Sequence, residues 1–217
     1  MAASILEKTA VATAGVVAIV TLTLLAASRA FPGAPGADDG PLTFFIAEGA
    51  QRTGYLPSDR QLAQWAFESW ERHASGAFRL KASSESDAVV RLYWAPLDDS
   101  TFGEMRPIVV KGRPGAAVFV RADMEALGPD IALRARQDTL WRDTIVYLTC
   151  LHELGHAFGL SHTADFPDIM YFFGYGGDIV EYFSRYRRQL KSREDIPSTS
   201  GLSDVDVARL RAVQMRR

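Results

Sequence analysis

Cysteine is almost absent from this 217-residue chain, in which Cys150 is the only one. No disulfide can form within the chain, so a disulfide-stapled scaffold is excluded. Net charge is also close to zero, because 24 basic side chains are balanced by 26 acidic ones. This balance gives no reason to expect nucleic acid as a partner. With 47% hydrophobic and 23% charged residues, the composition is typical of a globular protein.

Charged residues are missing altogether from residues 9–28, "TAVATAGVVAIVTLTLLAAS", which follow Lys8. About 20 apolar residues are enough to cross a bilayer as a helix. The same run fits the apolar core of a signal peptide, with a small-x-small cleavage site at residues 28–30. Residues 1–30 are therefore predicted to be a signal peptide or an uncleaved membrane anchor. Either one places the rest of the chain outside the cytoplasm.

The remaining chain divides into a short Pro/Gly-rich linker, residues 31–41, and one domain, residues 42–217. Strands are expected at 42–49, 88–96, 108–111 and 116–121, where the residues are rich in β-formers. Helices are expected from a Ser58–Gln61 capping box to Gly76, from Asp143 as N-cap to Gly159, over 178–191, and from a Ser203–Asp206 capping box onward. Because no regular strand–helix–strand repeat is present, the predicted fold class is α+β.

Three of the four histidines lie in "HELGHAFGLSH", residues 152–162. His152 and His156 are four residues apart, so a helix places both rings on one face. There they can bind one zinc ion at about 2.0–2.1 Å. Glu153 then projects beside the ion, which is the position of a general base. The spacing predicts two metal ligands with a neighbouring carboxylate.

His162 lies six residues beyond His156, which in a continuous helix would be about 9 Å further along the axis. It can reach the same ion only if the helix stops and the chain doubles back. Gly159 stands where this reversal is needed, and glycine adopts left-handed backbone angles without a Cβ penalty. We therefore interpret His162 as the third ligand of a metal site.

This run, taken with Met170 in "DIMY", resembles the HExxHxxGxxH motif and the Met-turn of metzincin zinc proteases. Residues 161–163 and 170–171 are most similar to the matrixin branch, and a weaker likeness extends from residue 42 to residue 213. The resemblance implies a metzincin-like domain with a twisted mixed sheet, an active-site helix and two or three further helices. It also implies a Zn²⁺ cofactor and endopeptidase activity on protein or peptide substrates. The residues it implies are the ligands His152, His156 and His162, the general base Glu153, the structural residues Gly159 and Met170, and a substrate-binding edge strand at 116–121.

The sequence departs from the matrixin pattern after the Met-turn. Phe172 follows Met-Tyr where matrixins usually have proline, and residues 173–201 resemble an insertion. Glu181, within this insertion, could instead be the third ligand of a gluzincin site, but we expect it to be an ordinary surface carboxylate. His73 is expected to end a helix rather than to bind metal. Cys150 is expected to be a buried packing thiol.

Two other functions stay open at this point. A membrane-anchored or exported module could bind zinc and peptide without cleaving, although zinc binding alone has no need of Glu153. The metal site could also be purely structural. A structural zinc is normally closed by four protein ligands, and Cys150 lies on a different helical face from His152, where it is badly placed to be the fourth.

Overall fold

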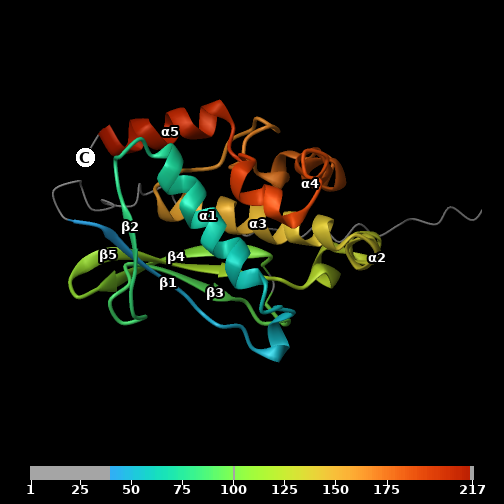
Figure 1. Ribbon diagram of the computed structural model, residues 1–217, viewed down its shortest axis with the longest axis horizontal. Coiled ribbons are helices and arrows are strands. Elements are labelled where there is room, and N and C mark those ends of the chain that lie inside the picture. The colour runs from blue at the N-terminus through green and yellow to red at the C-terminus, as the bar shows by residue number, and fades with distance from the viewer. Residues whose placement is uncertain (1–39, 100, 216–217) are drawn as a thin grey trace, which may run out of the picture.

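The computed structural model of the protein describes residues 40–99 and 101–215 (Figure 1). Within these residues no helix is both long and apolar enough to cross a membrane. The leader predicted for residues 1–30, and nearly all of the linker predicted for 31–41, lie outside the described residues.

Five strands form one mixed sheet in the order β2-β1-β3-β5-β4. Their bounds are β1 Leu42–Ile46, β2 Leu80–Ala82, β3 Val90–Trp94, β4 Gly103–Val110 and β5 Arg113–Val120. The strands β2, β1, β3 and β5 run parallel, and β4 is antiparallel to β5. This confirms an α+β fold with a mixed sheet.

The strand expected at 116–121 does not lie at the edge of the sheet. It belongs to β5, which pairs with β3 on one side and with β4 on the other. The chain turns tightly at Lys111 and Gly112, which have φ of 51° and 80°, and β4 therefore folds against the outer side of β5. The prediction of an edge at 116–121 was wrong, and the edge strand on this side is β4.

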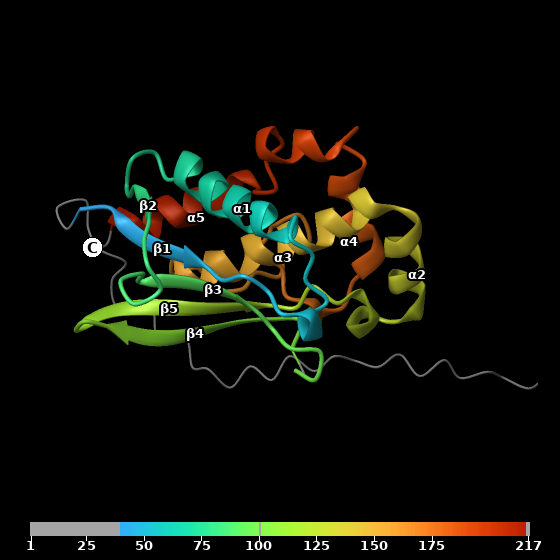
Figure 2. The ribbon, with the colours of Figure 1, turned by 60° about the horizontal axis from the view of Figure 1, so that its bottom comes forward.

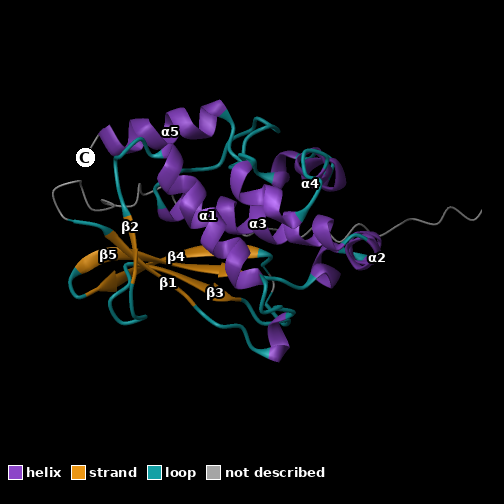
Figure 3. Ribbon diagram, in the orientation of Figure 1, coloured by secondary structure: helices purple, strands orange, loops and turns teal. Residues whose placement is uncertain are grey.

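Five helices lie mostly on one side of the sheet (Figures 2 and 3). Their bounds are α1 Asp59–His73, α2 Pro129–Gln137, α3 Thr139–Ala157, α4 Ile179–Arg187 and α5 Asp204–Met215. Helices α1 and α3 pack against each other, and α3 also packs along β5 and β4. Alternate residues of β1 and β3 are buried under these helices, as expected for a sheet with one covered face.

The central helix α3 is buried over most of its length. Trp70 of α1 donates its indole N–H to the carbonyl oxygen of Leu151 at 2.9 Å, and Phe158, just after α3, stacks on Phe78. Cys150 is fully buried, as expected for a packing thiol, and burial raises the pKa of this thiol well above its usual value. Tight packing of α3 fixes the position of the residues at its end.

Helix α1 begins directly after Ser58, as predicted, but the predicted capping box is absent, and the predicted start of α3 was wrong. Ser58 makes no side-chain cap, and the neighbouring Asp59 instead accepts a hydrogen bond from the Leu56 amide at 2.8 Å. Helix α3 begins one turn earlier than expected, because Asp138 caps it by accepting from the Trp141 amide at 3.0 Å. Asp143 lies inside this helix and pairs with Arg193.

The start of the last helix was predicted correctly. Ser203 Oγ accepts from the Asp206 amide at 3.0 Å, and Asp206 Oδ2 accepts from the Ser203 amide at 2.9 Å. Helix α2 was missed, although Pro129 at its first position after Gly128 and apolar residues at helical spacing were a usable signal. The expected helix at 178–191 is present as the shorter α4, which packs on α3.

Candidate metal centre

The C-terminal part of α3 presents two imidazoles from successive turns. The ring centroids of His152 and His156 are 5.0 Å apart. The helix ends at Ala157, and Gly159 follows with φ of 97°, in the left-handed region. The Leu160 amide donates back to the carbonyl oxygen of Gly155 at 2.9 Å. The chain therefore reverses at Gly159, as predicted from the sequence.

This reversal brings His162 back to the other two histidines. Its Nε2 lies 3.2 Å from Nε2 of His152 and 3.1 Å from Nε2 of His156. Three nitrogens bound tetrahedrally to one zinc at normal Zn–N lengths would be about 3.3 Å apart. The three side chains therefore form a group that could hold a metal ion.

The hydrogen bonds of the first two histidines fix which nitrogen is free. Nδ1 of His152 is 2.6 Å from the carbonyl oxygen of Ile169, and Nδ1 of His156 is 2.8 Å from that of Leu160. A carbonyl oxygen only accepts, so Nδ1 carries the proton in both rings. In the neutral ring the lone pair of Nε2 then points toward the other histidines, as a metal ligand requires.

Burial keeps all three imidazoles neutral. It lowers the pKa of His152 well below its usual value, with added repulsion from His156 and His162. It also lowers the pKa of His156, and it brings the pKa of His162 to about 4. Neutral imidazoles with converging lone pairs repel one another, whereas a cation between them would satisfy all three. The donor set therefore fits a metal ion of the zinc type.

Glu153, which follows His152 in sequence, is buried and does not belong to this group. Burial, and then repulsion from Glu104 of β4, raises the pKa of its carboxyl group to about 8. A cation held by the three imidazoles would lower this pKa, because a nearby positive charge favours the ionised form of a carboxyl group.

The segment around Met170 packs against α3 and against the chain that follows His162. Met170 is fully buried, and a Cβ built on Gly155 would lie 2.4 Å from its sulfur, so the side chain packs directly against α3. The Thr163 amide donates to the Met170 carbonyl oxygen at 2.9 Å, and the Phe172 amide donates to that of Thr163 at 3.2 Å. These bonds hold the chain after His162 against the chain after Met170.

Contacts from distant helices support His152 and His162, and the sequence did not predict them. The Ile169 amide donates to Asp206 of α5 at 2.7 Å, and the Tyr182 hydroxyl donates to the Ile169 carbonyl oxygen at 3.1 Å. The same carbonyl oxygen accepts from His152. Phe172 stacks on the ring of His162, with centroids 4.9 Å apart and planes 23° apart. The aromatic residue in the usual proline position thus contacts a candidate ligand.

The alternative ligands lie elsewhere. Glu181 is exposed and accepts a hydrogen bond from Arg188 at 3.0 Å, so the expectation of a surface carboxylate is confirmed. Nδ1 of His73 pairs with the carbonyl oxygen of Ser69 at 2.8 Å in the last turn of α1. Neither residue joins the three-histidine group, and Cys150 does not join it either.

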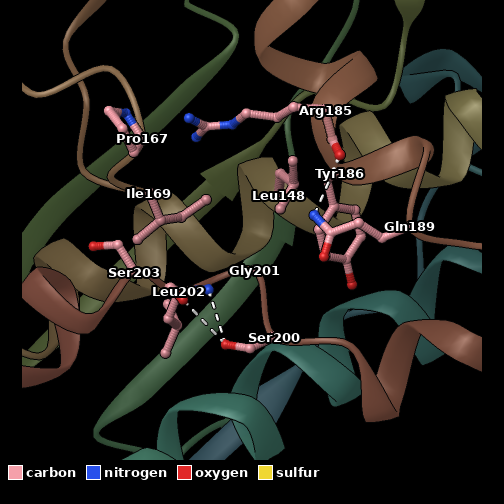
Figure 4. Close-up of a pocket in the computed structure, with 10 residues that line it drawn as sticks. All are labelled: Leu148, Pro167, Ile169, Arg185, Tyr186, Gln189, Ser200, Gly201, Leu202 and Ser203. Carbon is pink, nitrogen blue, oxygen red and sulfur yellow. Dashed lines mark hydrogen bonds between the residues drawn. The ribbon is translucent and has the colours of Figure 1, made fainter.

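A cavity of about 340 Å³, whose lining is drawn in Figure 4, does not include the three-histidine group. Its lining comes from α3, α4 and the loops before Ile169 and Ser203. Ile169 forms part of the wall and links the cavity to the support of His152. None of the three candidate ligands lines the cavity, and Glu153 does not line it.

Comparisons with known proteins give a distant structural likeness. No family model matches the chain, and no curated protein matches it. Among solved structures, the chain is similar to archaemetzincin from Methanopyrus kandleri, with a TM-score of 0.42 and 16% sequence identity over 82% of this chain and 97% of that one. The geometry of the metal centre, rather than this likeness, supports the function proposed below.

Proposed function

We propose that the protein is a zinc-dependent endopeptidase of the metzincin type, similar to the matrixin branch. The observation that supports this is the convergence of three imidazoles, whose neutral form burial favours, with a buried carboxylate next to His152 in sequence. Within residues 40–99 and 101–215, no Cys, Asp or Glu completes the group as a fourth ligand. Three protein ligands with an open position are typical of catalytic zinc, whereas structural zinc is closed by four.

In this mechanism His152, His156 and His162 hold the ion through Nε2. Zinc bound there supplies Lewis-acid polarisation of a water molecule and of a peptide carbonyl. Glu153 accepts a proton from the attacking water and then delivers it to the amine nitrogen that leaves. The same carboxylate serves both transfers, so a pKa near neutrality suits it to act first as base and then as acid.

The substrate is proposed to lie along β4 in an extended conformation. One side of β4 pairs with β5, and no other strand of the described sheet pairs with its outer side. An unpaired strand edge offers main-chain hydrogen bonds to an added peptide strand. The first residue of β4, Gly103, lies against Glu153, so a peptide on this edge would pass beside the proposed base.

The rival function is a zinc- and peptide-binding module without catalysis. Glu153→Ala separates the two, because the carboxylate is not one of the three ligands and its loss should leave the zinc content unchanged. Loss of a positioned general base typically costs about 10²–10⁴ in rate. We expect kcat to fall at least that far, with peptide binding largely retained.

The test is cleavage of a proteome-derived peptide library, with sites mapped by mass spectrometry, by wild type and Glu153→Ala at equal zinc content. The library also reports the cleavage specificity. A wild-type protein that holds zinc and cleaves nothing would establish the binding module. A Glu153→Ala protein that cleaves as fast as wild type would exclude the mechanism.

We also propose that this domain acts outside the cytoplasm, on the basis of the uncharged run at residues 9–28. Protease treatment of intact cells that carry a C-terminally tagged chain tests the location. The tag should be digested from outside the cytoplasm, and a protected cytoplasmic tag would exclude export. The size of the mature chain then distinguishes a cleaved signal peptide from an anchor.

A further inference from the structure

Gly103, a residue with no side chain, lies against the side chain of the proposed base Glu153. A Cβ built on Gly103 would lie 2.4 Å from Oε1 of Glu153, and 2.8 Å from both its Cδ and its Cγ. Real Cβ atoms essentially never approach other heavy atoms within 3.0 Å. The carboxylate of Glu153 therefore occupies the space that any other residue at position 103 would need.

Backbone conformation does not explain the glycine at this position. Gly103 is the first residue of β4, opposite Val120 of β5, and its φ is not in the left-handed region. The hairpin at the other end of the same strand provides the contrast. Gly112 has φ of 80°, and a Cβ there would meet no atom within 4 Å. Gly112 serves the turn, whereas Gly103 serves the contact with Glu153.

We propose that Gly103 is a positioning residue for Glu153, an inference that rests on the proposed function. The backbone of β4 lies against the end of the side chain and confines the carboxylate between the strand and α3. Confinement limits the rotamers of a side chain that would otherwise have three free torsions. It keeps the carboxylate beside the three imidazoles, at the end of the strand along which the substrate is proposed to lie.

The expected effect of Gly103→Ala follows from which atoms must move. All three short contacts are with the outer part of the Glu153 side chain, so the side chain is displaced and the fold is kept. A misplacement of about 1 Å in a catalytic group can cost about 10²-fold in rate. We expect kcat to fall by about 100-fold, with KM and zinc content nearly unchanged.

Gly112→Ala is the matched control, since it makes the same chemical change in the same hairpin. It introduces strain at a positive φ, and the melting temperature should therefore fall. It places no atom near Glu153, so kcat should remain at the wild-type value. A fall in kcat for both variants would mean that general destabilisation, not positioning, causes the loss.

A second measurement does not depend on activity. Melting temperatures are compared for wild type, Gly103→Ala, Glu153→Ala and the double variant, all loaded with zinc. Overpacking should lower the melting temperature of Gly103→Ala by a few degrees, on the order of 5 °C. Removal of the Glu153 side chain makes room for the new methyl group. Gly103→Ala should therefore lower the melting temperature only slightly in the Glu153→Ala background.

The two measurements separate the two proposals. Equal melting losses in both backgrounds, or unchanged kcat in Gly103→Ala, would overturn the positioning role while leaving the endopeptidase intact. Coupled melting losses with a 100-fold lower kcat would support both. A wild-type protein that holds zinc but cleaves no peptide would overturn the proposed function, and with it any catalytic role for Gly103.

Discussion

The two halves of α3 differ in how their buried polar groups are paired. In the N-terminal half each buried charge has a partner of opposite charge. Arg142 donates to both oxygens of Asp59 at 2.7 and 2.8 Å, with Asp59 fully buried, and Asp143 pairs with Arg193. In the C-terminal half two imidazoles, those of His152 and His156, point lone pairs at the ring of His162, which follows the helix.

Within one helix, the first half therefore contributes to stability and the second half to the proposed function. Paired charges in the first half compensate each other, so that half needs nothing from outside to be stable. The second half is buried at a cost that only a bound cation would offset, which is typical of a functional site. If this comparison is right, changes in the two halves should affect different measurements.

The largest effect is expected from loss of a candidate ligand. His162→Ala removes one of three donors and should weaken zinc binding more than the roughly 10–100-fold that is usual for outer-shell changes. His73→Ala is the control, because His73 lies outside the three-histidine group. Zinc per chain after dialysis against a chelator is the measurement. Full zinc retention in His162→Ala would show that the metal is held elsewhere.

Loss of Arg142 should lower the free energy of unfolding without changing the zinc content. Arg142→Ala leaves Asp59 buried without its partner, and breaking a buried pair in this way costs about 3–5 kcal/mol. Arg188→Ala is the control, since its partner Glu181 is exposed and such pairs contribute about 0–1 kcal/mol. Urea denaturation measures the loss in free energy of unfolding for both variants. Similar losses in the two variants would contradict the distinction between buried and surface pairs.

The metal-free protein should lose stability as pH rises from about 6.5 to 8. Burial raises the pKa of Glu153 from its usual 4.5 to about 8 in the folded protein, so over this range the folded state holds up to one proton more than the unfolded state. Stability contributed by this proton is therefore lost as pH rises toward 8, by at most about 2 kcal/mol across the interval.

Glu153→Gln removes this titration and is the control for it. The difference between wild type and Glu153→Gln in urea midpoint should grow with pH over the same interval. The pKa values of His152 and His162 are lowered in the folded protein, so these histidines affect stability only below about pH 6.5, where the unfolded state gains protons first. A wild-type curve that parallels that of Glu153→Gln would show that the carboxyl group is not buried as described.

The smallest effect is expected at Phe172. Phe172→Ala removes the ring stacked on His162, and aromatic pairs contribute about 0.5–1.5 kcal/mol beyond burial. Zinc affinity should therefore fall by about 2–10-fold in a competition with a chromogenic chelator. Leu133→Ala, at a half-exposed position on α2, should leave affinity unchanged. An unchanged affinity in Phe172→Ala would mean that stacking on Phe172 does not help to position His162.

Local spacing was enough to predict the metal centre. The four-residue spacing of His152 and His156 places two rings on one helical face, and a reversal at Gly159 is needed before His162 can join them. Both are properties of a short segment, and the structure has the reversal at φ of 97°. The capping box at Ser203 and Asp206 was predictable for the same reason.

Predictions failed where a partner distant in sequence decided the outcome. Ser58 has helical backbone angles and makes no side-chain cap, and the neighbouring Asp59 binds Arg142, a residue 83 positions away. Helix α3 starts at Asp138 rather than Asp143, whose side chain is taken by Arg193. A capping motif reports only local hydrogen bonds, and a buried ion pair with good geometry overrides it.

The sequence by itself determined the three candidate ligands, the neighbouring carboxylate and the turn that joins them, because these depend on helical geometry over eleven residues. Only the tertiary structure decided which strand forms the edge, which helices support Ile169, and why Gly103 has no side chain. Those features depend on contacts between segments far apart in the chain, such as β4 with Glu153 of α3. Periodicity in one segment carries no information about the surface of another.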